Sequence, residues 1–170
     1  MRIVDLTHSI IGNIPAGDIN GLSVRYAKSI DGIPLDYLLP LATVIDVTHR
    51  RSTDRVDRAD LTTTGVADIA GCILHTGWMD AHIAGSASDP PQLTVEAAAY
   101  LLEGGVRTVA ADFPLTSNAA DLLLQNGCVS ACCLSNIQEL KDEIVRLAVL
   151  PLKYRDLCTA PARVMAIELH

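Results

Sequence analysis

The sequence predicts one α/β domain, spanning residues 1–170, whose sheet mixes parallel and antiparallel strands. The clearest strand signal is Ala42–Thr48, a run rich in β-branched residues. A second apolar run, Gly71–Trp78, enters a Thr-Gly turn and predicts a buried strand around which the rest is organised. Residues 71–112 follow the order strand, loop, helix, strand, which is typical of a βαβ unit.

Short strands separated by loops are expected in the first part of the chain. Gly12, Pro15 and Gly17 interrupt any regular pattern there and predict an irregular connection. The expected elements, in order, are a strand at Arg2–His8, a loop at residues 10–20, a strand at Leu22–Ala27, a turn at Asp31-Gly32 and a short helix or helical turn at Asp60–Ile69.

Helices and strands alternate in the second half. Thr94, with Glu96 in the first turn, predicts a helix start, and Gly104-Gly105 predicts its end. A polar loop is expected after Trp78, which would place this aromatic on the rim of a pocket. The remaining elements are strands at residues 106–112, 128–134, 145–152 and 163–169, and helices at residues 118–125 and 136–142, the last opened by a capping box of Asn136 and Glu139.

Composition limits the classes of function. A hydrophobic fraction of 49% with only 4% aromatic residues predicts a core of Leu, Ile, Val and Ala. We expect Ile73 in this core, together with Val44-Ile45 and Leu150–Leu152. A net charge of −7 argues against a nucleic-acid-binding surface. No apolar run approaches the ~20 residues of a membrane span.

The five cysteines lack Cys-x-x-Cys spacing, and no targeting segment is visible, so we expect a protein of the reducing cytoplasm. Cys132 and Cys133 are adjacent. On a strand their side chains would point to opposite faces, which favours two buried core residues over a redox-active or metal-binding pair.

Short blocks along nearly the whole chain resemble one family. They are Asp5-Leu6-Thr7-His8, Asp31-Gly32 with Pro34-Leu35, Ala42–Val47, Leu74-His75-Thr76-Gly77-Trp78, Leu134-Ser135-Asn136, Leu150–Lys153 and Ala160–Arg163. In this order and spacing they resemble the metal-dependent cyclase-like hydrolases that include bacterial kynurenine formamidase and isatin hydrolase. The resemblance implies the swivelling β/β/α fold, hydrolysis of C–N bonds in amides, and a homo-oligomer.

The chain departs from that family at the metal-binding motif His-x-Gly-Thr-His-x-Asp-x-Pro-x-His. In its place stands Leu22–Ile30, which contains no His, Asp or Cys. Ala120 stands where the family has a later His, and Cys132 where it has a Glu. A metal ion needs three or four donors within ~2.0–2.3 Å. We therefore expect neither a metal nor another cofactor.

Polar residues at the predicted strand ends are the candidate catalytic groups. Asp5, His8 and Asp46 are the first choice, because the resemblance places Asp5 and His8 close to the family's active site. Three residues apart on a strand, Asp5 and His8 would face opposite sides, so a direct acid–base dyad is not expected. Cys132 is either a nucleophile activated by a neighbour or a buried inert thiol.

The candidate ligand-binding residues are Thr76, Gly77 and Trp78, with Tyr26 and Leu22 at or in the former pocket. His75, Asp80 and His82 have a spacing that a loop could fold around a metal. No spacing rule for zinc is satisfied, however, which favours a solvated loop.

Two functional classes stay open, because function resides in sites rather than in folds. The first is a non-catalytic or repurposed protein that binds a small carbonyl or aromatic molecule, or acts as a partner of an active family paralogue. The second is a hydrolase of a small amide, lactam or formamide, either metal-independent or with a site completed by another chain.

Overall fold

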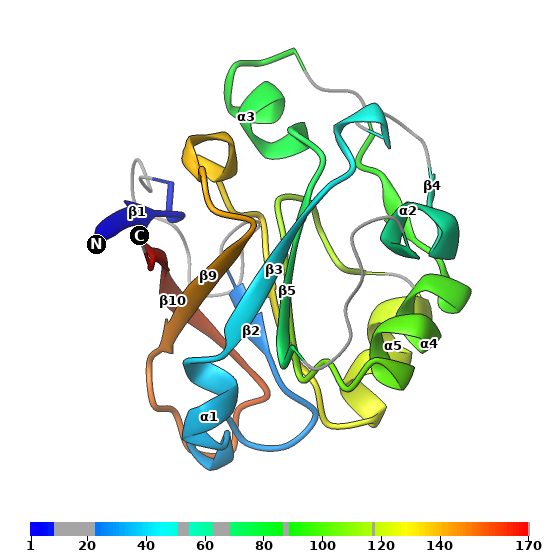
Figure 1. Ribbon diagram of the computed structural model, residues 1–170. Coiled ribbons are helices and arrows are strands. Elements are labelled where there is room, and N and C mark those ends of the chain that lie inside the picture. The colour runs from blue at the N-terminus through cyan, green and yellow to red at the C-terminus, as the bar shows by residue number, and fades with distance from the viewer. Residues whose placement is uncertain (9–22, 51–54, 63–68, 87–88, 117, 170) are drawn as a thin grey trace.

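The computed structural model describes residues 1–8, 23–50, 55–62, 69–86, 89–116 and 118–169 (Figure 1). The expected loop at residues 10–20 and Leu22 lie outside these ranges. Within them the chain forms an eight-stranded mixed sheet and a small two-stranded one, joined by short helices. The prediction of a mixed α/β fold is thus confirmed.

The large sheet closes on itself. Its strands are β1 (Arg2–Asp5), β2 (Ser23–Arg25), β3 (Leu41–Asp46), β5 (Gly71–His75), β7 (Thr108–Ala111), β8 (Val129–Cys132), β9 (Ile144–Pro151) and β10 (Thr159–Glu168). Their order is β1-β10-β2-β8-β7-β5-β3-β9, and β9 also pairs with β10. Among the described residues, all but β1 therefore form a seven-stranded barrel, in which β3, β5, β7 and β8 run parallel.

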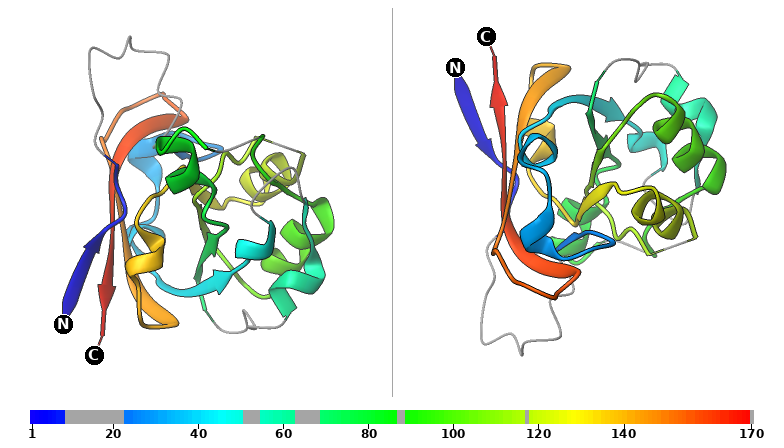
Figure 2. Two further views of the ribbon diagram at one scale, coloured as in Figure 1. Left: turned by 90° about the horizontal axis from the view of Figure 1, so that it is seen from above. Right: turned by 90° about the horizontal axis from the view of Figure 1, so that it is seen from below.

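Strand β10 closes this barrel. One edge pairs with β9 from Ala162 to Glu168. The other edge pairs first with β2 through residues 159–161 and then with β1 through residues 165–168. The two ends of the chain consequently lie side by side, on the side of the molecule away from the helices α4 (Val95–Glu103) and α5 (Asn118–Gln125) (Figure 2).

Helices fill the connections between the strands. The α-helices are α1 (Leu35–Leu38), α2 (Arg58–Thr62), α3 (Trp78–Ile83), α4 (Val95–Glu103) and α5 (Asn118–Gln125); the 3-10 turns are η1 (Ile30–Gly32), η2 (Thr48–Arg50) and η3 (Ile137–Glu139); the small sheet is β4 (Arg55–Val56) with β6 (Gln92–Leu93). The Thr94 hydroxyl caps α4 by accepting from the Ala97 amide at 3.2 Å, as predicted. No helix in the described part of the chain is long and apolar enough to cross a membrane.

Strand alternation divides the apolar residues into two cores. Ile73 lies inside the barrel with Ala42 and Ala110. Its neighbours Cys72 and Leu74 face outward, into a second core between the parallel strands and the helices α4 and α5. The βαβ prediction for residues 71–112 is confirmed, because β5 and β7 pair in parallel.

Three predictions about packing were wrong in part. Leu150 is 46% exposed, because it lies on the outer face of β9, whereas its neighbour Val149 points into the core. Leu152 follows the end of the strand and is 55% exposed. Ile45 is buried, but in the outer core rather than beside Ile73. The expected helix at residues 136–142 is only the turn η3, because Asn136 adopts a left-handed conformation (φ 61°) and makes no cap.

The segment after β5 also differs from the prediction. Instead of a polar loop, α3 begins at Trp78, directly after Gly77 in a left-handed conformation. Trp78 is only 5% exposed and belongs to the outer core, so it is not a rim aromatic. The small residues after Trp78 predict a loop, but the segment is helical, and Trp78 and Met79 are the buried residues of this helix.

Candidate functional site

The carboxyl ends of the parallel strands meet at one edge of the sheet, which is where ligands bind in many α/β proteins. Asp46 ends β3 and His75 ends β5, opposite each other in register. Asp112 follows β7 on the next strand. The sheet thus brings Asp112 to the same edge as Asp46 and His75, which the sequence analysis singled out.

Asp112 organises the turn after β5. Its buried carboxylate accepts hydrogen bonds from the Thr76 amide (2.9 and 3.0 Å), the Thr76 hydroxyl (2.7 Å) and the Gly77 amide (2.5 Å). The Thr76 hydroxyl accepts in turn from the Trp78 amide at 3.1 Å. Burial raises the pKa of the Asp112 carboxyl, and the hydrogen bonds from Thr76 and Gly77 oppose that rise. These contacts fix the start of α3.

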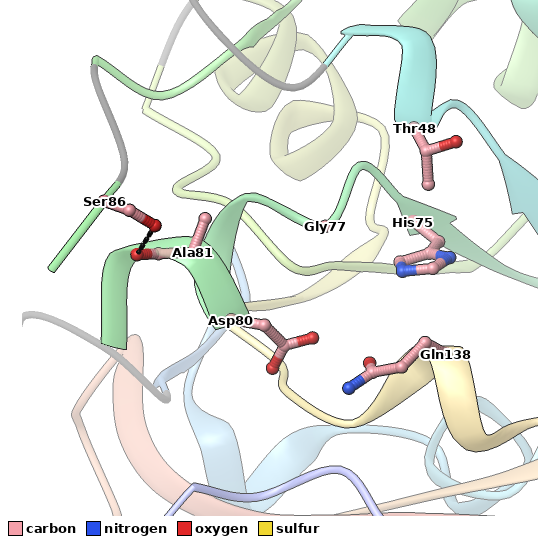
Figure 3. A pocket seen from close by; sticks show the side chains of 7 residues that line it. All are labelled: Thr48, His75, Gly77, Asp80, Ala81, Ser86 and Gln138. Atoms are coloured by element: carbon pink, nitrogen blue, oxygen red, sulfur yellow. Dashed lines mark hydrogen bonds between the residues drawn. The ribbon is translucent and has the colours of Figure 1, made fainter. Parts of the chain in front are cut away.

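A pocket of about 420 Å³ opens beside this turn. Figure 3 shows the side chains of His75, Asp80 and Gln138 directed into one space from β5, α3 and η3. The complete lining is Thr48, His75, Gly77, Asp80, Ala81, Ser86 and Gln138. A second hollow of about 360 Å³ shares His75 and Gln138 with it. Both volumes are typical of small-molecule sites, which span ~300–1,000 Å³.

Asp46 lines the second hollow together with His75. The Thr48 amide donates to the Asp46 carboxylate at 2.9 Å and holds the pKa of Asp46 below its usual range. Burial opposes this effect, while the nearby imidazoles of His75 and His49 add to it. Asp46 is therefore an ionised acceptor at the rim of the site.

The other two candidate catalytic residues lie on or just after β1. Asp5 pairs with Arg163 of β10 and accepts from the Thr7 amide at 3.1 Å. Burial raises the pKa of the Asp5 carboxyl, but the bonds from Arg163 and Thr7 outweigh it and lower that pKa overall. The Nδ1 atom of His8 is buried and has no hydrogen-bond partner among the described residues. Among the described residues, no hydrogen bond links any two of Asp5, His8 and Asp46.

The predicted ligand-binding residues are divided between different environments. Gly77 lines the pocket, and Thr76 lies buried beneath it against Asp112. Trp78 belongs to the outer core, where it stacks on His82 with ring centroids 4.6 Å apart. Tyr26 is buried in the core of the barrel.

Gln138 and Thr48 are pocket residues that the sequence analysis missed. Gln138 stands 63 positions from His75, and only the path of the chain through β8 and η3 brings the two together. The signal that was available is the block Leu134-Ser135-Asn136, which ends just before η3. The Asn136 amide donates to Asp80 at 3.4 Å and so ties η3 to α3 across the pocket.

The donor set does not fit the metal that the resemblance implies. Ser23 and Arg25 of β2 occupy the stretch where the motif is expected, and Ser23 pairs with Cys132 of β8. Within the described ranges, no three His, Cys, Asp or Glu side chains gather to hold an ion. His75 and Asp80 share a pocket, but His82 points to Trp78 instead. The described residues therefore do not supply the three or four donors that a metal ion needs.

A comparison with protein families matches residues 16–118 to the family described as "Putative cyclase". The match spans more than half of the chain. The chain belongs to this cyclase family. A comparison with curated proteins found no match.

Solved structures share the fold of this cyclase-family chain. A protein described as a predicted metal-dependent hydrolase from Bacillus stearothermophilus is 18% identical with a TM-score of 0.77, and the alignment covers 97% of each chain. Isatin hydrolase A from Labrenzia aggregata, bound to benzyl benzoate, is 17% identical with a TM-score of 0.78, over 97% of this chain and 93% of that one. Isatin hydrolase A from Ralstonia solanacearum is 18% identical with a TM-score of 0.78, over 98% and 81%. Such low identities establish the fold alone.

Proposed function

We propose that this chain is a cyclase-family protein that lacks the metal site of its relatives. It binds a small carbonyl compound at the mouth of its barrel, in the pocket beside His75. The observation that carries the proposal is the lining of the pocket. The Gln138 amide and the His75 imidazole can donate hydrogen bonds to a carbonyl oxygen, while Asp80 accepts from an N–H beside it. The same residues fall short of a metal site.

Two relatives of the same fold are isatin hydrolases, so isatin is a suitable probe ligand. A metal-bound hydroxide would supply much of the ~8–23 kcal/mol by which enzymes lower reaction barriers. Among the described residues that line the pocket, none takes its place as a nucleophile. Binding of isatin without turnover is the expected behaviour. The aromatic half of such a ligand would lie over Gly77 and Ala81 rather than stack on Trp78.

Binding and turnover should be measured together, with isatin and N-formylkynurenine, in the presence and absence of Mn²⁺ and Zn²⁺. We expect saturable binding, reported by the fluorescence of the single tryptophan, and no hydrolysis. His75→Ala and Gln138→Ala should each weaken binding about tenfold, as expected for a lost hydrogen bond. Thr62→Ala, on the exposed face of α2, is the matched control.

Other outcomes favour the hydrolase alternative. Turnover abolished by His8→Ala or Asp46→Asn would place catalysis on those side chains and overturn the proposal. Turnover that appears only with an active family paralogue would establish a site shared between chains. About one tightly held ion per purified chain, measured by elemental analysis, would also contradict the proposal.

A further inference from the structure

Cys132 and Cys133 are not on opposite faces, contrary to the sequence-based prediction. Cys132 is the last residue of β8, and Cys133 leaves the strand with a left-handed backbone (φ 63°). This conformation is uncommon for a residue with a side chain. Both side chains belong to the outer core, and a hydrogen bond from the Cys133 thiol lowers the pKa of Cys132.

Polar groups surround the Cys132 sulfur. The hydroxyl of Ser23 on the neighbouring strand lies 3.7 Å from Sγ, and the Cys132 thiol donates to the Ser23 backbone carbonyl at 3.7 Å. The backbone of Leu115 forms a further hydrogen bond to Cys132. Arg25 donates to the Leu115 carbonyl at 3.3 Å and so holds this segment beside the thiol. Of the four buried cysteines Cys132 is the most exposed, at 8%.

These contacts distinguish the pair from the other buried cysteines. Hydrogen bonds from Cys133 and Ser23 lower the pKa of the Cys132 thiol, against the effect of burial. The pKa of Cys133 is raised, because its proton is engaged by Cys132 and because it is buried. Burial, with a smaller contribution from Cys128, raises the pKa of Cys72, and burial raises the pKa of Cys128 to about 11. One sulfur of the pair is thus prepared as a thiolate, and its neighbour retains a proton.

We propose that Cys132 and Cys133 form a reaction site for hydroperoxides, with Cys132 as the attacking sulfur and Cys133 as the resolving thiol. The geometry favours this class of electrophile, because reduction of a peroxide requires three groups. They are a thiolate that attacks, a proton for the leaving oxygen, and a second thiol close enough to form a disulfide. The site lies on the outer side of β8 and β2, and none of its residues lines the pocket at the barrel mouth.

The reaction balances in two steps. The Cys132 thiolate attacks one oxygen of the peroxide, the O–O bond breaks and an S–O bond forms, and the departing alkoxide or hydroxide takes up the proton that Cys132 had released. The peroxide is thereby reduced and the sulfur is oxidised to a sulfenic acid. The Cys133 sulfur then attacks the Cys132 sulfur, an S–S bond replaces the S–O bond, and hydroxide leaves with the Cys133 proton as water.

The test treats the full-length protein with equimolar hydrogen peroxide, followed by alkylation and intact-mass and peptide mass spectrometry. We expect the loss of two hydrogen atoms on the peptide that carries Cys132 and Cys133, reversed by dithiothreitol. In Cys133→Ser the reaction should stop at a sulfenic acid on Cys132, which dimedone traps. Cys158→Ser removes an exposed thiol and should leave the reaction unchanged.

Ser23→Ala keeps both thiols and removes only one hydrogen bond, so it tests the site where a cysteine substitution impairs folding. It should slow the oxidation roughly fivefold. Oxidation confined to Cys158, or disulfides formed only between chains, would overturn the proposal, as would an unchanged rate in both Ser23→Ala and Cys133→Ser.

Discussion

Asp112 receives hydrogen bonds from both the backbone amide and the hydroxyl of Thr76. These bonds connect the residue after β7 to the residue after β5. Removing the carboxylate in Asp112→Ala leaves buried amides of Thr76 and Gly77 without partners. We expect a loss of on the order of 3 kcal/mol in the free energy of unfolding. Thr76→Val, which removes only the hydroxyl, should cost about 1 kcal/mol.

Urea unfolding of both single variants and of the double variant measures the interaction free energy between Asp112 and Thr76. The two changes should be non-additive by roughly 0.5–3 kcal/mol, because they remove the same contact. Strict additivity would show that the two side chains act separately.

Asp60 should make stability depend on acid pH. Burial raises the pKa of its carboxyl, but hydrogen bonds from the Asp57 amide (2.7 Å), His49 (2.9 Å) and Arg50 (3.3 Å) outweigh burial and lower it. A lowered pKa stabilises the fold above the unfolded value near 3.8, and this stabilisation is lost as the pH falls through the folded pKa. Asp60→Asn should lose on the order of 1–3 kcal/mol at pH 7.

Thermal unfolding as a function of pH checks this expectation. The gap between the parent protein and Asp60→Asn should narrow below about pH 4. A gap that widens on acidification would contradict the assignment.

Gly71 is required by close packing at the start of β5. A Cβ atom there would lie 3.0 Å from the side chains of Ala42 and Pro40 and 3.1 Å from the Leu41 carbonyl. Gly71→Ala should therefore cost roughly 1–3 kcal/mol through overpacking. Gly32→Ala, where nothing lies within 4 Å, is the matched control and should change the melting temperature little.

The outer face of β1, β10 and β9 is expected to be the contact between copies of the chain, in line with the homo-oligomer that the family resemblance implies. Ile3 and Leu150 are 54% and 46% exposed on this face, and Ile167 pairs with Ile3 between them. The double variant Ile3→Asp, Leu150→Asp places two charges on this face. Light scattering should therefore show a larger fraction of monomers. Leu35→Asp, 77% exposed on α1, should leave the assembly unchanged; a monomeric parent would refute the expectation.

The local sequence pattern was sufficient to predict an element wherever one strand or capping signal dominated. The β-branched run before Val47 and the capping residue Thr94 specified β3 and α4, because strand propensity and capping act over a few residues. The helix after Gly77 was missed, since its stability comes from Trp78 and Met79 packing into a distant core rather than from its own sequence.

The site was less predictable than the fold. His75 and Asp46 could be placed at strand ends, but their meeting with Gln138 depends on the sheet order, which no local window contains. The contact between Cys132 and Cys133 rests on one left-handed residue that is not glycine. The strand pattern around it predicts the opposite geometry.

The closing role of β10 has a consequence for the nascent chain. During synthesis β3, β5, β7 and β8 can pair while the ribosome is still translating, because their partners are already made. The ring stays open until Thr159–Glu168 emerges, and until then β2 and β9 each present an unpaired edge. Such edges recruit strands from other molecules. The period between translation of β9 and release of β10 is therefore when this protein most needs protection by chaperones.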